Sequence, residues 1–124
     1  NNYDKILLDV PCSSSGTIQK NPDIKWKLNK EQLYTFKKLQ LSILNNISKH
    51  LNKGSEILYS TCSLLKEENE DNIIEFLKKN RNFEVVEVAD KRLKQFKNKI
   101  GGITIIPSDN FYEGMFAIKL KKNA

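Results

Sequence analysis

Two cysteines stand where an apolar run gives way to polar turn residues. Cys12 follows residues 6–10 in the segment Pro-Cys-Ser-Ser-Ser-Gly, and Cys62 follows residues 57–59 in Ser-Thr-Cys-Ser. A cysteine attacks as its thiolate, and Asp9 adds a carboxylate next to the first of the two. If both runs are neighbouring parallel strands, the three groups meet at the carboxyl edge of one sheet, where ligands bind in open α/β folds. The sequence therefore predicts a reactive site built from Cys12, Cys62 and Asp9.

Other interpretations of the two cysteines stay open at this point. Zinc needs about four ligands, and the two cysteines with His50, the only histidine, do not supply them. A dithiol redox site usually uses a close Cys-x-x-Cys pair, whereas these thiols come from separate segments. Two buried structural cysteines are the simplest alternative. The repeated context, a strand end followed by Pro-Cys-Ser or Thr-Cys-Ser, favours a shared site.

Alternating strands and helices are expected to position these residues. The first apolar run is nearly continuous, which is typical of a parallel strand covered on both faces. The expected strands are residues 3–10, 55–61, 83–88 and 113–120, with a short edge strand at 103–107, and the expected helices are residues 29–52 and 66–80. We predict an α/β fold in which the four main strands lie in the order first, second, fourth, third, with the last strand antiparallel. The first strand is then an exposed edge, and unpaired apolar edges invite self-association.

The longest expected helix, residues 29–52, has recognisable start and stop signals. Asn29 can cap it, with Gln32 three residues further on. Gly54 suits the left-handed position just past a helix end. Apolar residues recur at helical spacing and predict the buried stripe: Leu33, Phe36, Ile43, Leu44, Ile47 and Leu51.

The composition favours a polyanionic partner. The 124 residues carry a formal charge of +6 and have a sequence pI near 9.3, which suits nucleic acid, although a lysine-rich composition without any partner is the alternative. Lys25, Trp26 and Lys27 place basic groups around an aromatic ring near the first cysteine, as phosphate contact with base stacking requires; a lid over the core is the other interpretation of Trp26. No run approaches the roughly 18 apolar residues of a membrane span. The sparse cysteines favour a reduced, intracellular compartment.

Several segments resemble one known family. Residues 9–16, Asp-Val-Pro-Cys-Ser-Ser-Ser-Gly, resemble the Asp-Ala-Pro-Cys-Ser-Gly-x-Gly motif of the NOL/NOP/Sun-domain RNA cytosine-5 methyltransferases. Residues 59–63, Tyr-Ser-Thr-Cys-Ser, with Glu-Glu-Asn-Glu at 67–70, resemble their second cysteine motif. Three further segments are similar to segments that the family has in the same order. They are residues 21–26 (Asn-Pro-Asp-Ile-Lys-Trp), the pair Leu39-Gln40, and residues 113–117 (Glu-Gly-Met-Phe-Ala). The resemblance covers almost the whole chain.

The resemblance implies a Rossmann-like methyltransferase that uses S-adenosyl-L-methionine (AdoMet) to convert a cytosine of rRNA or tRNA into 5-methylcytosine. In that family the second motif supplies the thiolate that attacks C6 of the base, here Cys62. The thiol of the first motif, here Cys12, assists breakdown of the covalent adduct. Asp9 is expected to hold the polar edge of the cytosine. Asp9 and Pro11 are expected to contact the cofactor, and Lys25, Trp26 and Lys27 are expected to contact the RNA.

One departure from the family pattern concerns the cofactor. The glycine-rich AdoMet loop of the family lies upstream of the Asp-x-Pro-Cys strand, and these 124 residues contain no Gly-x-Gly. Residues 1–124 are therefore expected to be the carboxyl-terminal part of a catalytic domain, which by itself neither binds AdoMet tightly nor turns over. A non-catalytic RNA-binding or assembly module with the same fold is the alternative function, and a two-thiol redox protein is a third.

Overall fold

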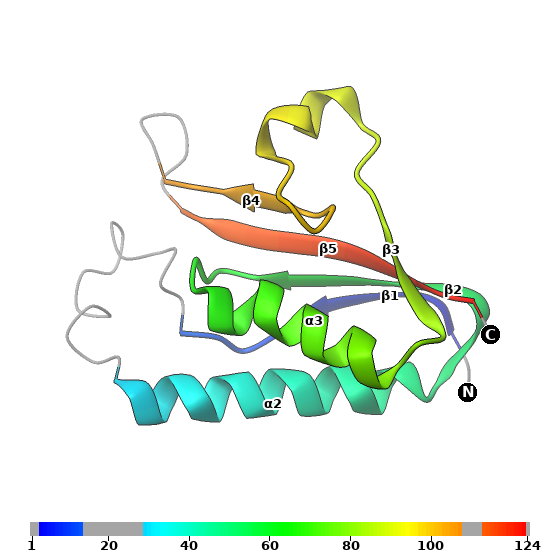
Figure 1. The fold of residues 1–124 in the computed structure, drawn as a ribbon, viewed down its shortest axis with the longest axis horizontal. Coiled ribbons are helices and arrows are strands. Elements are labelled where there is room, and N and C mark those ends of the chain that lie inside the picture. Colours follow the sequence, from blue (N-terminus) through cyan, green and yellow to red (C-terminus); the bar gives the residue numbers. More distant parts are fainter. Residues whose placement is uncertain (1–2, 14–28, 108–112, 124) are drawn as a thin grey trace.

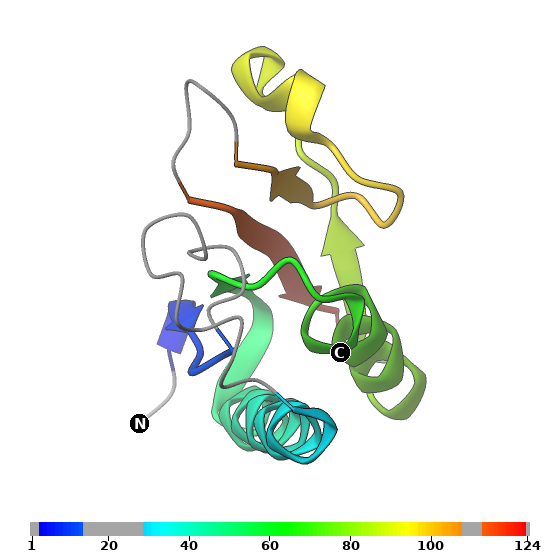
Figure 2. The same ribbon diagram turned by 90° about the vertical axis from the view of Figure 1, so that its left-hand side faces the viewer.

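A mixed β-sheet carries two helices on one of its faces (Figures 1 and 2). The computed structural model describes residues 3–13, 29–107 and 113–123. Its elements, in chain order, are β1 (Tyr3–Asp9), α2 (Lys30–Ser48), β2 (Leu51–Thr61), the 3-10 turn η2 (Lys66–Glu68), α3 (Glu70–Lys79), β3 (Phe83–Val86), the 3-10 turn η3 (Lys91–Phe96), β4 (Ile103–Ile105) and β5 (Met115–Lys122). None of the helices in these ranges is long and apolar enough to cross a membrane.

The strands lie in the order β1-β2-β5-β3, and β4 also pairs with β5. β1 runs parallel to β2, whereas β5 is antiparallel to β2, β3 and β4. This arrangement confirms the predicted strand order and the predicted antiparallel last strand. β1 ends the order and forms an edge of the sheet, and α2 joins it to β2.

Helix α2 begins where the sequence predicts and ends earlier. The Asn29 side chain accepts a hydrogen bond from the Gln32 backbone N–H at 2.8 Å, which caps the first turn. The predicted end at residue 52 is wrong, because α2 stops at Ser48 and β2 already starts at Leu51. Leu51 is buried as the first residue of a strand instead of the last residue of a helical stripe.

Gly54 lies within β2 and does not terminate helix α2. It has a φ of +89° and lies where the pairing of β1 with β2 shifts, between the pairs Tyr3–Leu51 and Lys5–Glu56. The longer β2 segment between these pairs makes a bulge, and glycine reaches the left-handed region there without a Cβ penalty.

The core lies between the helical layer and the facing side of the sheet. Alternate residues of β2 and β5 point toward it, as the two-residue period of a strand requires. Fully or almost fully buried side chains from both layers fill it: Leu44, Ile57, Tyr59, Ile73, Phe76, Phe116, Ile118 and Leu120. The opposite face leaves Leu7 and Leu58 exposed.

The second predicted helix, residues 66–80, is divided into two elements. A 3-10 turn, η2, covers Lys66–Glu68, and α3 follows it from Glu70. Acidic Glu70 and Asp71 lie in the first turn of α3 and basic Lys78 and Lys79 in the last, which complements the helix dipole. The break turns the chain between the end of β2 and α3, and it places Glu68 in the interior.

Candidate active site

A cavity of about 470 Å³ opens at the carboxyl ends of β1 and β2. It combines carboxylates, hydroxyls and a thiol with apolar side chains. Its lining residues are Leu7, Asp9, Ser60, Thr61, Cys62, Ile105, Glu113, Gly114 and Met115. The mixture offers polar anchoring groups beside an apolar surface, as small-molecule sites commonly do.

The ladder between β1 and β2 positions Asp9. Asp9 pairs in register with Ser60, and the Val10 backbone N–H donates to the Ser60 carbonyl at 3.2 Å. The Ser60 hydroxyl points at Asp9, with 3.5 Å between Oγ and Oδ1. A carboxylate at the tip of an edge strand therefore lies opposite the end of β2, at Ser60, two residues before Cys62.

Cys62 is half-buried and its thiol is electrostatically coupled to the other predicted residues. Burial raises the pKa of the Cys62 thiol, and Coulombic interactions with Cys12, Asp9 and Glu113 raise that pKa further. These effects favour the protonated thiol over the thiolate. Cys12 is also half-buried, and in the described part of the chain neither cysteine forms a disulfide. The structure thus brings both thiols and Asp9 to one edge of the sheet.

A buried carboxylate, Glu68, joins the two cysteine loops. Its Oε1 accepts from the Ser13 backbone N–H at 2.7 Å, and its Oε2 accepts from the Ser13 hydroxyl at 2.6 Å. The Ser63 hydroxyl also donates to Oε2. Because Ser13 follows Cys12 and Ser63 follows Cys62, one side chain holds the residues next to both thiols.

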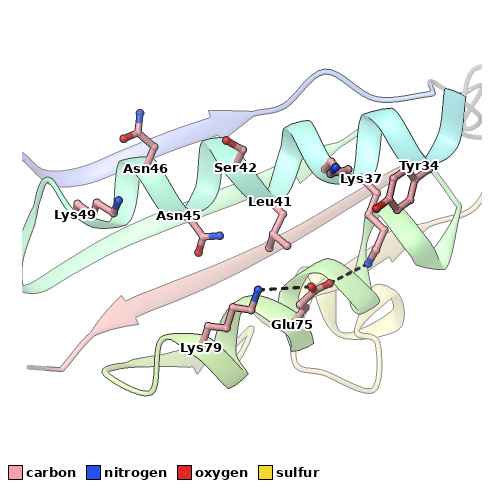
Figure 3. Close-up of a pocket in the computed structure, with 10 residues that line it drawn as sticks. Tyr34, Lys37, Leu41, Ser42, Asn45, Asn46, Lys49, Glu75 and Lys79 are labelled. Carbon is pink, nitrogen blue, oxygen red and sulfur yellow. Dashed lines mark hydrogen bonds and ion pairs between the residues drawn. The ribbon is translucent and has the colours of Figure 1, made fainter. Parts of the chain in front are cut away.

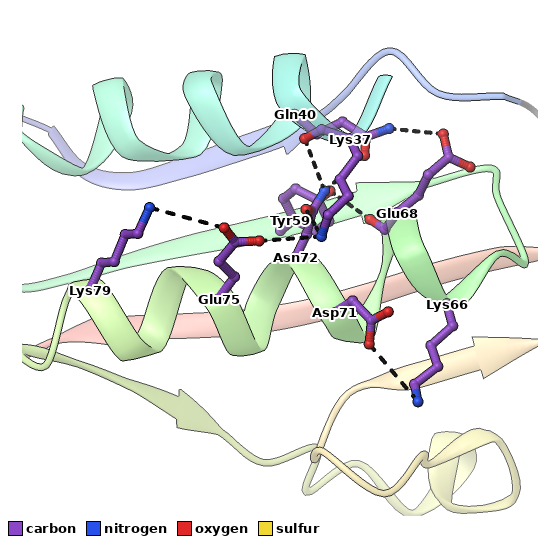
Figure 4. A network of polar contacts seen from close by, with 9 residues as sticks. All are labelled: Lys37, Gln40, Tyr59, Lys66, Glu68, Asp71, Asn72, Glu75 and Lys79. Carbon is purple, nitrogen blue, oxygen red and sulfur yellow. Dashed lines mark hydrogen bonds and ion pairs between the residues drawn. The ribbon is translucent and has the colours of Figure 1, made fainter. Parts of the chain in front are cut away.

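A wider polar network supports this carboxylate (Figure 4). Gln40 of α2 donates through Nε2 to Glu68 Oε1 at 3.1 Å and to the Pro11 carbonyl at 2.8 Å. The Asn72 side chain donates to Gln40 Oε1 at 3.0 Å. The Tyr59 hydroxyl donates to the Glu68 backbone carbonyl at 2.9 Å. Helix α2, strand β2 and helix α3 therefore all contribute to holding the turn that carries Glu68.

The loop that carries Cys62 is closed on itself by Thr61 and Asn69. Thr61 Oγ1 accepts from the Ser63 N–H at 3.1 Å and donates to Asn69 Oδ1 at 2.6 Å. Asn69 in turn donates through Nδ2 to the Ser63 carbonyl at 2.8 Å. Both Thr61 and Asn69 are almost fully buried. These contacts fix the backbone on either side of Cys62.

The predicted site residues fall into three groups. Asp9 and Cys62 line the cavity, and Cys12 lies in the loop that Glu68 joins to the Cys62 loop. Pro11 is not one of the described residues that line the cavity, and its carbonyl is bound by Gln40. The predicted RNA contacts Lys25, Trp26 and Lys27 lie outside the described residues.

Sequence reasoning missed the linking role of Glu68 and its partners Ser13 and Ser63. Glu68 belongs to the run Glu67-Glu68-Asn69-Glu70, which was the available signal. Nothing local separates Glu68 from Glu67, yet Glu68 is buried and Glu67 is exposed.

A second hollow, a groove of about 560 Å³, runs between α2 and α3. Four lysines line it: Lys37, Lys38, Lys49 and Lys79. Glu75 lies between two of them, 3.3 Å from Lys37 and 4.0 Å from Lys79 (Figure 3). This carboxylate offsets part of the positive charge of the groove.

Comparison with known proteins identifies one family. The family model described as 16S rRNA methyltransferase RsmB/F matches residues 1–121. The ribosomal RNA small subunit methyltransferase B of Pectobacterium atrosepticum is 36% identical over 121 residues, and that of Erwinia tasmaniensis is 38% identical over 120 residues. These alignments cover 98% and 97% of this chain. The chain spans 27% and 26% of the length of these two relatives.

Solved structures of similar fold come from Pyrococcus horikoshii. NSun6, solved with SFG, superposes with a TM-score of 0.80 at 26% identity and covers 99% of this chain and 31% of its own. A methyltransferase homolog protein superposes with a TM-score of 0.76 at 27% identity, covering 98% of this chain and 39% of its own. The open α/β sheet is thus part of a Rossmann-like methyltransferase fold.

Proposed function

Because the chain belongs to the 16S rRNA methyltransferase RsmB/F family, we propose that it forms the nucleophile-bearing part of an AdoMet-dependent RNA cytosine-5 methyltransferase. The substrate class is rRNA, as the names of its relatives suggest, with tRNA as the other candidate. The observation that carries the proposal is that Asp9 and Cys62 line one cavity at the edge of the sheet, while Glu68 binds the residues that follow Cys12 and Cys62.

Cys62 is the proposed nucleophile. It lines the cavity, and its thiol must first lose its proton because its environment favours the protonated form. The Sγ lone pair then forms a bond to C6 of cytosine, and the π electrons of the C5–C6 double bond move toward C5. This covalent step makes C5 nucleophilic.

Asp9 is proposed to hold the polar edge of the cytosine. Its carboxylate can accept from the exocyclic amino group, and in its protonated form it can donate to the ring nitrogen. Its pairing with Ser60 keeps it at the cavity in either form. Such a preorganised group stabilises charge as the adduct forms.

Cys12 is proposed to assist breakdown of the adduct. Product release requires that the C5 proton leave, that its bonding pair restore the C5–C6 double bond, and that Sγ depart with the S–C6 pair. Cys12 is near enough to influence the Cys62 thiol electrostatically, and the contacts of Ser13 and Ser63 with Glu68 keep both loops together.

The cavity suits part of a cofactor that carries a sulfonium. AdoMet, when bound, supplies the electrophilic methyl group that C5 takes up. The carboxylates of Asp9 and Glu113 would hold a cation at the cavity, beside apolar Ile105 and Met115. NSun6 was solved with SFG, an AdoMet analogue, which supports the same cofactor here. Of the two residues expected to contact the cofactor, Asp9 lines the cavity and Pro11 does not, so the structure supports a cofactor role for Asp9 alone.

The 124-residue chain by itself is proposed to be inactive, because it contains no Gly-x-Gly loop for the cofactor. Isothermal titration with AdoMet should detect no tight binding, and low-micromolar affinity would contradict this part of the proposal.

Two further parts of the proposal concern partners. Lys25, Trp26 and Lys27 are proposed to contact the RNA, in keeping with the charge of +6. Self-association is proposed through β1, an edge strand that exposes 54% of Tyr3 and 69% of Leu7. A monomer by light scattering at high protein concentration would contradict the self-association.

Covalent trapping tests the central claim. The complete gene product carrying this chain should form a denaturation-resistant adduct with RNA that contains 5-fluorocytosine. Cys62→Ala should abolish that adduct, whereas the matched variant Cys12→Ala should still form it. RNA binding without any Cys62-dependent adduct would instead support a non-catalytic RNA-binding module.

A further inference from the structure

We propose that Glu68 is a positioning residue that holds the two cysteine loops in register and thereby sets the placement of Cys62 relative to Cys12. The inference deepens the proposed function and rests on it for its catalytic consequence. Glu68 is not among the described residues that line the cavity, so it acts through its neighbours and not on the substrate.

The contacts of Glu68 use the full acceptor capacity of a carboxylate. Its two oxygens offer about four lone-pair sites, and in the described part of the chain they accept from four donors: the Ser13 N–H, the Ser13 hydroxyl, the Ser63 hydroxyl and Gln40 Nε2. The side chain is 0% exposed. Removing any donor leaves part of a buried carboxylate without a partner, which is costly. The carboxylate therefore favours the single arrangement in which both loops reach it.

The turn that carries Glu68 is also anchored to β2 and α2. The Tyr59 hydroxyl donates to the Glu68 backbone carbonyl, and Gln40 ties the side chain to the Pro11 carbonyl as well. Tyr59 and Gln40 are both fully buried and come from β2 and α2. Glu68 thus links the two loops to the buried side chains of β2 and α2.

The placement of the thiols matters because adduct formation and adduct breakdown are assigned to different cysteines. A misplacement of about 1 Å can cost about 100-fold in rate. Loosening the link should therefore slow both steps without touching the reacting groups themselves.

Glu68→Gln is the least disruptive change that weakens the link. An amide nitrogen at the Oε1 position would face the Ser13 N–H and Gln40 Nε2, which are both donors. At the Oε2 position its two N–H groups could donate to the hydroxyls of Ser13 and Ser63, which would then accept instead of donating. The first orientation loses two contacts, and the second exchanges hydrogen bonds to a carboxylate for weaker ones with a neutral amide, both at constant side-chain size. Glu67→Gln is the matched control, because Glu67 lies on the same turn and is exposed.

A double-mutant cycle on thiol reactivity tests the placement directly. The alkylation rate of Cys62 by iodoacetamide is measured against pH in the complete gene product, with mass spectrometry to identify the site. In the parent, Cys12→Ala should move the Cys62 profile to lower pH, because the Coulombic interaction with Cys12 that raises the pKa of Cys62 is removed. In the Glu68→Gln background the same shift should be at least halved, and in the Glu67→Gln background it should be unchanged.

Equal shifts in all three backgrounds would overturn the inference. If Glu68→Gln does not fold, as judged by circular dichroism, Ser63→Ala replaces it, because that change removes one of the four donors and leaves the carboxylate in place. A Cys12-dependent shift that is undiminished in folded Ser63→Ala would then be the contradicting result.

Adduct trapping separates this inference from the proposed function. Glu68→Gln should slow trapping on 5-fluorocytosine RNA by about 100-fold while RNA affinity stays at the parent value. A parent that forms no adduct would overturn the proposed function, and the thiol cycle would still decide the placement role of Glu68. A parent that traps RNA together with a Glu68→Gln variant that traps it equally fast would overturn the placement role alone.

Discussion

Replacing Tyr59 with phenylalanine removes one oxygen atom from the interior, at the contact that holds the Glu68 turn to β2. The Tyr59 side chain is 0% exposed, and its hydroxyl donates to the Glu68 carbonyl at 2.9 Å. Burial holds the pKa of the Tyr59 phenol well above its usual range, so the hydroxyl remains a donor at all ordinary pH values. The substitution therefore deletes a hydrogen bond that is always present in the native protein.

The magnitude follows from the burial of both partners. A hydrogen bond contributes about 0.5–1.5 kcal/mol net, and a buried group left without its partner costs about 1–3 kcal/mol. The phenylalanine ring fills the same space and keeps its edge contact with Phe116, whose ring centroid lies 6.3 Å away. We therefore expect Tyr59→Phe to lower the free energy of unfolding by about 1–2 kcal/mol.

Urea unfolding of the complete gene product, followed by far-ultraviolet circular dichroism, measures this loss. Tyr34→Phe is the matched control, because the same oxygen is removed from a side chain that is 60% exposed. Surface changes of this kind stay within about 0.5 kcal/mol. Equal losses for the two variants would refute the reasoning that the buried hydroxyl anchors the turn.

The remaining predictions concern the Cys62 thiol and two glycines. Asp9→Asn should lower the pKa of Cys62 and move its alkylation profile to lower pH. Burial is the largest cause of the raised pKa, and the substitution does not remove it. The profile should therefore move only part of the way to that of an ordinary thiol. An unchanged profile would show that Asp9 does not act on the thiol. Gly102→Ala should lower the free energy of unfolding by about 1–3 kcal/mol, because the new Cβ would overlap the Ala117 carbonyl oxygen. Gly54→Ala should cost about 1–2 kcal/mol through its positive φ alone, since nothing lies within 4 Å of the new Cβ. Urea titration measures both losses, and a loss at Gly54 above this range would contradict the steric argument.

Local patterns predicted the elements better than their boundaries. The cap formed by Asn29 and Gln32 is a contact between residues three apart, so the start of α2 could be read directly. The end of α2 could not be read from the sequence, because Leu51 fits the apolar stripe of a helix and also fits the alternating pattern of β2. Pairing with Tyr3, far away in sequence, decides between the two. The chemical roles of Cys62, Cys12 and Asp9 stay predictions until trapping is measured.

The sequence by itself determined where reactive groups stand along the chain, because apolar runs that end in polar turns mark strand ends through local chemistry alone. It thereby indicated that Asp9 and Cys62 share an edge of the sheet. Only the tertiary structure decided that Glu68, and not its neighbour Glu67, is the buried carboxylate. That choice depends on donors 55 and 28 positions away, on Ser13 and Gln40. A carboxylate becomes stable in the interior only when the fold brings such donors to it, and no local pattern encodes that meeting.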